Sequence, residues 1–145
     1  MSNRGAWARR RSRRALLQAV YQWQMTGNEL AGIENDLADE GALKKADREF
    51  FRELLRGVVN NVEALDALLA PVLDRKVADL DKVEHALLRL GVYELRDRID
   101  VPFRVVIDEY VELAKVYGAE ESFKYVNGVL DRLAQDLRAL EHSAS

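Results

Sequence analysis

Apolar side chains recur at the spacing of one helix face along most of this 145-residue chain. The clearest run is Phe123, Val126, Leu130, Leu133 and Leu137, whose offsets of 0, 3, 7, 10 and 14 keep all five on one side of a helix. No segment alternates between apolar and polar residues for long enough to predict a strand. Only two prolines and eight glycines interrupt the pattern, which favours long helices. The sequence therefore predicts an all-α protein.

Helix start and stop signals divide the chain into six or seven helices. Asp47 is a candidate N-cap, and Pro71 ends one helix or opens the next short turn. We expect helices over about residues 6–25, 30–40, 47–69, from about 81, from 102 to 118, and from about 120–122 onward. We expect them to form a single domain over residues 1–145, with flexible tails at 1–5 and 142–145.

Catalytic and metal-binding patterns are missing from the sequence. The chain has no cysteine, which excludes disulfides, thiolate nucleophiles and cysteine-bound metals. Neither histidine, His85 or His142, has a serine or cysteine partner at a recognisable spacing, and carboxylate pairs such as Asp36 with Asp39 are typical of a solvated helix face. There is no glycine-rich phosphate loop and no metal motif. We expect a protein that is not an enzyme and that uses no cofactor, metal or small-molecule substrate.

The sequence shows no signal peptide behind its basic N-terminus. No apolar run approaches the roughly 20 residues that a membrane-spanning helix requires. We therefore expect a soluble cytoplasmic protein without a membrane partner.

Positive charge is concentrated at the N-terminal end. The first 28 residues contain six arginines and no acid, whereas the remainder carries a net charge of −9. Arg9 with Arg13, and Arg10 with Arg14, form i,i+4 pairs near the helix end where the macrodipole disfavours cations. Because these charges repel one another, the cluster favours an anionic partner, and guanidinium groups suit phosphates and bases. A solubilising surface and a basic membrane-surface helix are the alternatives.

Aromatic and amide side chains extend this basic surface. Tyr21 continues the helix row of Arg10 and Arg14, so it can stack on a base while the arginines hold the backbone. The alternative for Tyr21 is packing against a neighbouring helix. In the last helix, Asn127 is either an RNA donor or part of an interhelical hydrogen bond. Gly128 implies close approach by another helix or a ligand.

Three blocks of the sequence resemble the NusB family over nearly the whole chain. They are ARRR (8–11) with QAVYQW (18–23), YEL (93–95) followed by DVP (100–102), and ELAK (112–115) leading through YG (117–118) to YVNGVLD (125–131). Their order, their spacing and the chain length together make the match specific. Related helical domains occur fused to rRNA cytosine methyltransferases, and this chain is too short for such a catalytic domain, so the standalone factor is the better match.

The resemblance implies about seven helices in two packed subdomains. It implies binding of boxA, a single-stranded RNA element in ribosomal RNA leaders. It also implies a protein partner, the small ribosomal-subunit protein NusE. Together they are expected to join NusA and NusG on an RNA polymerase elongation complex, which then resists termination.

The resemblance places the RNA surface on the first helix and the start of the last. The residues expected to contact RNA are Arg9, Arg10, Arg11, Arg13, Arg14, Tyr21, Lys124, Tyr125 and Asn127. Arg14 stands where many relatives have an acid, which is expected to strengthen the phosphate contact. Tyr125 replaces a frequent phenylalanine and can still stack on a base.

Glu84 and Tyr93 lie on a helix that resembles part of the NusE-facing side. The acidic remainder of the chain fits this partner, because a ribosomal protein is expected to be basic. The residues leave two other hypotheses open. One is a protein-only scaffold whose basic N-terminal helix binds an acidic partner, and the weaker one is an unrecognised hydrolase that uses carboxylates.

Overall fold

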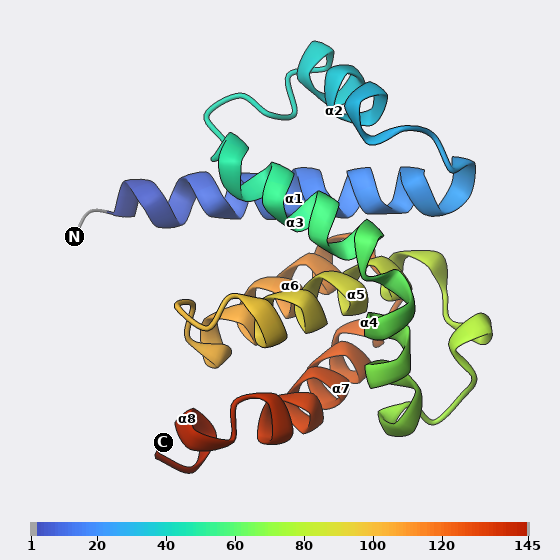
Figure 1. The fold of residues 1–145 in the computed structure, drawn as a ribbon, viewed down its shortest axis with the longest axis vertical. Helices are drawn as coiled ribbons and strands as arrows, with labels where there is room; N and C mark the ends of the chain where they lie inside the picture. Colours follow the sequence, from blue (N-terminus) through green and yellow to red (C-terminus); the bar gives the residue numbers. More distant parts are fainter. Residues whose placement is uncertain (1–2, 145) are drawn as a thin grey trace. The chain divides into compact units, whose positions relative to one another are not determined.

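The structure of the protein is a computed structural model that describes residues 3–144 (Figure 1). Over this range the chain forms α-helices and two short 3₁₀ turns and no strand, which confirms the all-α prediction. The α-helices are α1 (Asn3–Thr26), α2 (Leu30–Asp39), α3 (Arg48–Asn60), α4 (Val62–Leu69), α5 (Lys82–Asp97), α6 (Phe103–Tyr117), α7 (Ser122–Leu137) and α8 (Ala139–Ala144). The turns η1 (Ala70–Val72) and η2 (Val77–Asp79) lie between α4 and α5.

The helices divide into two compact units, Met1–Asn60 with α1 to α3 and Asn61–Ser145 with α4 to α8. The prediction of one continuous helix over residues 47–69 is therefore wrong. Asn61, with φ −118° and ψ 18°, separates α3 from α4. Two consecutive asparagines stand at this point, and asparagine side chains bond to nearby backbone groups and so compete with the helix.

In the first unit α1 packs against α2 and α3. The buried apolar side chains are Leu16, Ala19 and Val20 of α1, Ile33 and Leu37 of α2, and Phe51, Leu54, Leu55 and Val58 of α3. Asp47 caps α3 as predicted, because its Oδ1 accepts the Phe50 N–H at 3.0 Å. The Ser12 hydroxyl of α1 donates to the Asp47 carbonyl at 2.7 Å. The start of α3 is thus fastened to the basic part of α1.

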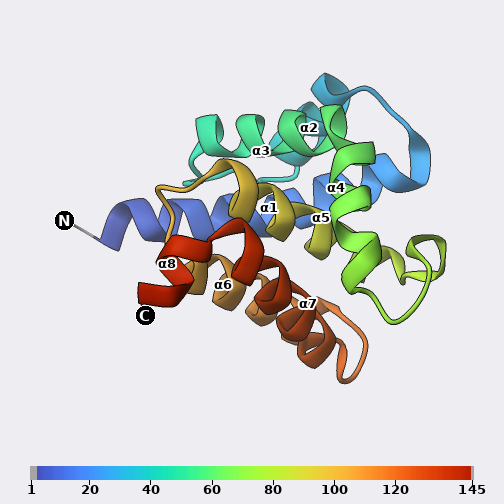
Figure 2. The same cartoon turned by 60° about the horizontal axis from the view of Figure 1, so that its bottom comes forward.

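In the second unit α5, α6 and α7 pack against one another, and α4 packs on α5 (Figure 2). Asp81 caps α5 by accepting the N–H groups of Val83 and Glu84, each at 3.1 Å. Gly91 of α5 lets α7 come close, since a Cβ at this position would lie 2.8 Å from the Leu130 methyl groups. As a result α5 is buried on nearly every side.

Polar groups buried in the second unit are paired. The Tyr110 hydroxyl donates to Glu94 at 2.5 Å, and both residues are fully buried. On α4, Asp66 lies 2.9 Å from the His85 ring nitrogen and accepts two bonds from Arg89, at 2.7 and 3.0 Å. Partial burial raises the pKa of Asp66, but the hydrogen bonds and charges of His85 and Arg89 outweigh it and lower the pKa to about 2. These charges hold α4 to α5.

Both chain ends are helical as far as they are described. Residues 3–5 belong to α1 and residues 142–144 to α8, while residues 1, 2 and 145 lie outside the described range, so the expected flexibility of the tails stays a prediction. Glu141 accepts the Phe103 N–H at the start of α6 at 2.9 Å, and the His142 ring stacks on Phe103 with centroids 5.0 Å apart. These contacts fasten α8 to α6. Among the described residues no helix has the length and apolarity needed to cross a membrane.

Candidate nucleic-acid interface

The arginines of α1 divide into two groups by their surroundings. The guanidinium carbons of Arg9 and Arg13 lie 4.9 and 5.0 Å from the centroid of the Phe50 ring, and Arg9 lies 3.8 Å from the Asp47 carboxylate. Arg13 is only 3% exposed, so the structure does not support the expected phosphate contact of this residue. The physical reason is its position three residues before buried Leu16, which places Arg13 on the inner face of α1. Its charge serves to hold α1 against α3.

Arg10, Arg11 and Arg14 form the second group, which is exposed. Arg10 lies over the Trp7 ring at 5.1 Å. Arg11 and Arg14 make no ion pair or hydrogen bond with any part of the chain that the structure describes. Tyr21 is 38% exposed and continues the row of Arg10 and Arg14 along α1. The solvent side of α1 therefore carries a basic row that ends in an aromatic ring, which can hold a phosphate backbone and stack on a base.

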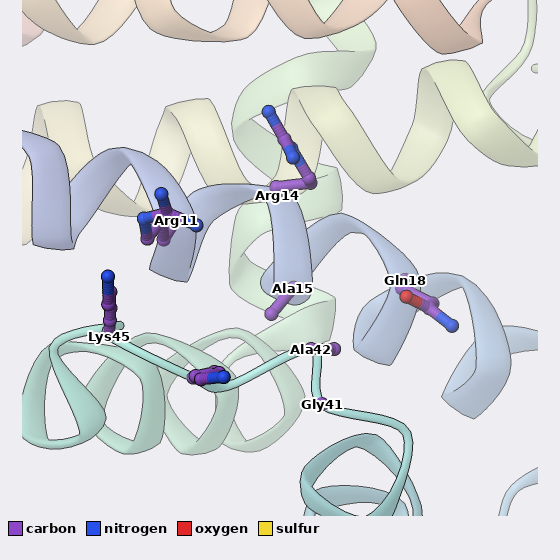
Figure 3. A pocket seen from close by; sticks show the side chains of 8 residues that line it. Arg11, Arg14, Ala15, Gln18, Gly41, Ala42 and Lys45 are labelled. Atoms are coloured by element: carbon purple, nitrogen blue, oxygen red, sulfur yellow. The ribbon is translucent and has the colours of Figure 1, made fainter.

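A pocket of about 330 Å³ lies beside this row in the first unit (Figure 3). Its lining comes from α1 and from the loop between α2 and α3, and consists of Arg11, Arg14, Ala15, Gln18, Gly41, Ala42, Lys44 and Lys45. Figure 3 shows Lys45 extending from the loop toward α1 near Arg11, while Arg14 extends away from the loop. Sequence reasoning missed Lys44 and Lys45. Their signal was present, since they are the chain's single pair of adjacent lysines and lie between two expected helices.

The second expected RNA motif lies near the start of α7, in the other unit. Lys124 and Asn127 are exposed, and the Lys124 ammonium lies 3.0 Å from Glu121. A Cβ at Gly128 would meet no described atom within 4 Å, so the expected close approach of another helix at this glycine is wrong. That α1 and this part of α7 serve one RNA surface stays a prediction.

Tyr125 stacks on a cation within its own unit. The Arg75 guanidinium, from the loop between η1 and η2, lies 4.2 Å from the Tyr125 ring centroid, and the Asp74 N–H donates to the Tyr125 hydroxyl at 3.4 Å. Arg75 donates to the Asp74 carboxylate at 2.7 Å, and this bond lowers the pKa of Asp74. Burial and the interaction with the Asp74 carboxylate raise the pKa of Tyr125, and they outweigh the Asp74 backbone N–H, which lowers it. Sequence reasoning missed Arg75, because no local pattern links it to a side chain so much later in the chain.

The two residues expected on the NusE-facing side are buried. Glu84 is 7% exposed and Tyr93 is 8% exposed, since α4, α6 and α7 all cover α5. The Glu84 carboxylate accepts the Ser122 hydroxyl at 2.6 Å and lies 4.0 Å from Arg75. Glu84 therefore joins α5 to the start of α7, and that these two residues belong to the NusE-facing side stays a prediction.

Comparison with known proteins identifies the family. A family model described as the NusB family matches residues 10–135. The chain belongs to the NusB family. The transcription antitermination protein NusB of Alcanivorax borkumensis is 56% identical over 136 residues, which cover 94% of this chain and 91% of that protein. The corresponding protein of Edwardsiella ictaluri is 50% identical, with 90% and 94% of the two chains covered.

Solved NusB structures share the fold. A crystal form of T. maritima NusB matches with a TM-score of 0.79 and 38% identity, covering 88% of this chain and 91% of that one. A structure of the antitermination factors NusB and NusE in complex with dsRNA matches with a TM-score of 0.81 and 28% identity, covering 88% and 96%. The resemblance read from the sequence is thereby confirmed. The NusB family consists of transcription antitermination factors and not of enzymes, which confirms the expected class of protein.

Proposed function

We propose that this protein binds the single-stranded boxA element of ribosomal RNA leaders together with NusE. The resulting complex joins NusA and NusG on the RNA polymerase elongation complex in the cytoplasm and makes the polymerase resist termination. The observation that carries this proposal is the exposed Arg11 and Arg14, which lack a partner among the described residues, on the same helix as exposed Tyr21. The related structure that contains NusB, NusE and dsRNA supports both kinds of partner.

Affinity and selectivity come from different side chains in this proposal. Arg10, Arg11 and Arg14 neutralise backbone phosphates and release counterions, which strengthens binding without reading the sequence. Tyr21 stacks on one base, a contact that contributes about 1–3 kcal/mol in single-strand binders. Buried Arg13 touches no RNA and positions the row by holding α1 against α3.

The α7 motif supplies further contacts in the same proposal. Asn127 is exposed and offers an amide to a base edge, and exposed Lys124 offers a charge to a phosphate. Tyr125 has Arg75 over its ring, so a base stacks on its opposite face and the ring lies between base and guanidinium.

NusE fits the charge of the remaining chain. Beyond the basic first 28 residues the chain carries a net charge of −9, and a basic ribosomal protein is attracted to such a surface. Because Glu84 and Tyr93 are buried, their contribution to this partner is indirect. Glu84 orients the start of α7 through Ser122, and so acts on the part of the chain where RNA contacts are proposed.

The test of the proposal is fluorescence anisotropy with a labelled boxA strand and a scrambled strand of equal length. Both are titrated with the protein at near-physiological salt, with and without NusE. We expect tighter binding of boxA than of the scrambled strand, and we expect NusE to widen the difference. NusE alone is the control for each strand.

Equal and weak binding of both strands under every condition contradicts the proposal. The arginines are then a generic basic surface, and the protein-only scaffold becomes the better account of the chain.

A further inference from the structure

The pocket beside α1 is positively charged, and only part of this charge comes from the arginines of α1. Four of its eight lining residues are basic, two from α1 and two from the loop between α2 and α3, and none is acidic. The side chains of Arg11, Arg14, Lys44 and Lys45 make no ion pair or hydrogen bond within the described part of the chain. Gln18, also part of the lining, donates to the Glu40 carboxylate at 3.4 Å.

This arrangement contrasts with three other basic side chains in the same unit. Arg48 and Arg52 share the Glu34 carboxylate at 2.8 and 2.9 Å, and Arg9 lies close to Asp47. The four cations that line the pocket instead lie close together without an opposite charge in the lining. An anion that enters the pocket relieves their mutual repulsion. Several cations in a concave site also produce a stronger positive potential than the same cations spread over a flat surface.

The loop backbone holds the lysines in a special conformation. Lys45 has φ +62°, a left-handed conformation that residues with a side chain rarely adopt, and Gly41 at the other end of the loop has φ +82°. This geometry directs Lys45 from the loop toward the helix that carries Arg11 (Figure 3). A volume of about 330 Å³ suits a phosphate group together with its sugar, and is at the small end of ligand pockets.

We propose that this pocket binds a backbone phosphodiester of the RNA strand, so that the RNA extends from α1 onto the loop between α2 and α3. The planar guanidinium of Arg11 donates two hydrogen bonds to the phosphate oxygens, and the ammonium groups of Lys44 and Lys45 add positive charge from the opposite wall. Arg14 also meets the strand. This inference rests on the proposed RNA binding, and it assigns to the loop lysines a role that the α1 arginines alone do not fill.

The experiment compares the double variant K44Q/K45Q with a charge-matched control, R104Q/K115Q, in which two exposed residues of α6 are changed. Affinity for boxA and scrambled strands is measured at several salt concentrations in the presence of NusE. For K44Q/K45Q we expect the slope of log K against log salt to become shallower by about 0.7 for each lost phosphate contact, so by 0.7 to 1.4. Both strands should lose affinity by the same factor, because phosphate contacts carry no sequence information.

Three results overturn the site. An unchanged slope in K44Q/K45Q, or an equal change in the α6 control, shows that the loop lysines hold no phosphate. The amide resonances of Lys44 and Lys45 can also be followed while inorganic phosphate is added. If phosphate shifts them at concentrations as low as those at which RNA does, the pocket is a site for the free anion. A wild-type protein that binds neither strand overturns the proposed function and this site with it, whereas the first two results leave the proposed function standing.

Discussion

Replacing Tyr21 with alanine weakens boxA binding by roughly 5- to 150-fold, the equivalent of about 1–3 kcal/mol for the loss of one base stack. The ring is 38% exposed and continues the row of exposed arginines on α1, so its removal deletes an RNA contact without opening a core cavity. The measurement is anisotropy of labelled boxA in the presence of NusE. Tyr21→Phe, which keeps the ring, retains most of the affinity.

The matched control for this prediction is Tyr117→Ala on α6. Tyr117 is 47% exposed, so the variant removes an equally accessible aromatic ring that we do not place on the RNA surface. We expect no change in boxA affinity for this control. A Tyr21→Ala variant that binds boxA within twofold of the wild-type protein contradicts the stacking role and favours simple packing of Tyr21 on its own unit.

The variant Arg138→Met lowers the free energy of unfolding by roughly 1.5–3 kcal/mol, as expected when charge-assisted hydrogen bonds to buried carbonyls are removed. Arg138 is 5% exposed and donates to the carbonyls of Leu95 at 2.7 Å, Arg98 at 2.8 Å and Glu94 at 3.2 Å. The Glu94 carbonyl also accepts the Arg98 N–H, and the Arg98 carbonyl accepts the Val101 N–H, each at 3.0 Å. Methionine removes the charged donor from all three carbonyls, including that of Leu95, which ends α5.

Urea-induced unfolding measures this loss. Arg132→Met is the control, because Arg132 lies on the same helix α7 and is exposed, and surface substitutions of this kind usually change stability by less than about 0.5 kcal/mol. The Glu141 carboxylate, 2.6 Å from Arg138, also loses its partner in the Arg138 variant. If Arg138→Met lowers the free energy of unfolding by less than about 1 kcal/mol, Arg138 is not an important hydrogen-bond donor to the carbonyls at the end of α5.

Local patterns in the sequence predict most of the helices, because apolar periodicity and capping residues act over single turns. Asp47 caps a helix as expected, and the helix expected from about residue 81 begins after Asp81, which caps it. The break at Asn61 was missed, since the apolar stripe continues across it in the sequence and only the backbone geometry reveals the interruption. The same limitation explains α8, which depends on contacts of Glu141 and His142 with the distant Phe103.

The positive charge of the candidate site could be predicted from the sequence, but which of its side chains are buried and which are exposed could not. Arginine is normally read as a surface residue, and only the packing of Phe50 against α1 reveals that Arg13 lies inside. Burial of Glu84 follows from three helices covering α5, which no local pattern indicates. Lys45 joins the basic surface because the α2–α3 loop folds back beside α1.

In the proposed complex, RNA lies along α1 and the loop between α2 and α3. The most direct test of this placement is photo-crosslinking of boxA RNA that carries 4-thiouridine, with the full-length protein and NusE together, followed by mass spectrometry of the linked peptides. We predict crosslinks in the peptides that contain Tyr21 and residues 41–45. Crosslinks confined to NusE, or to α6 and α8 of this chain, would contradict this placement.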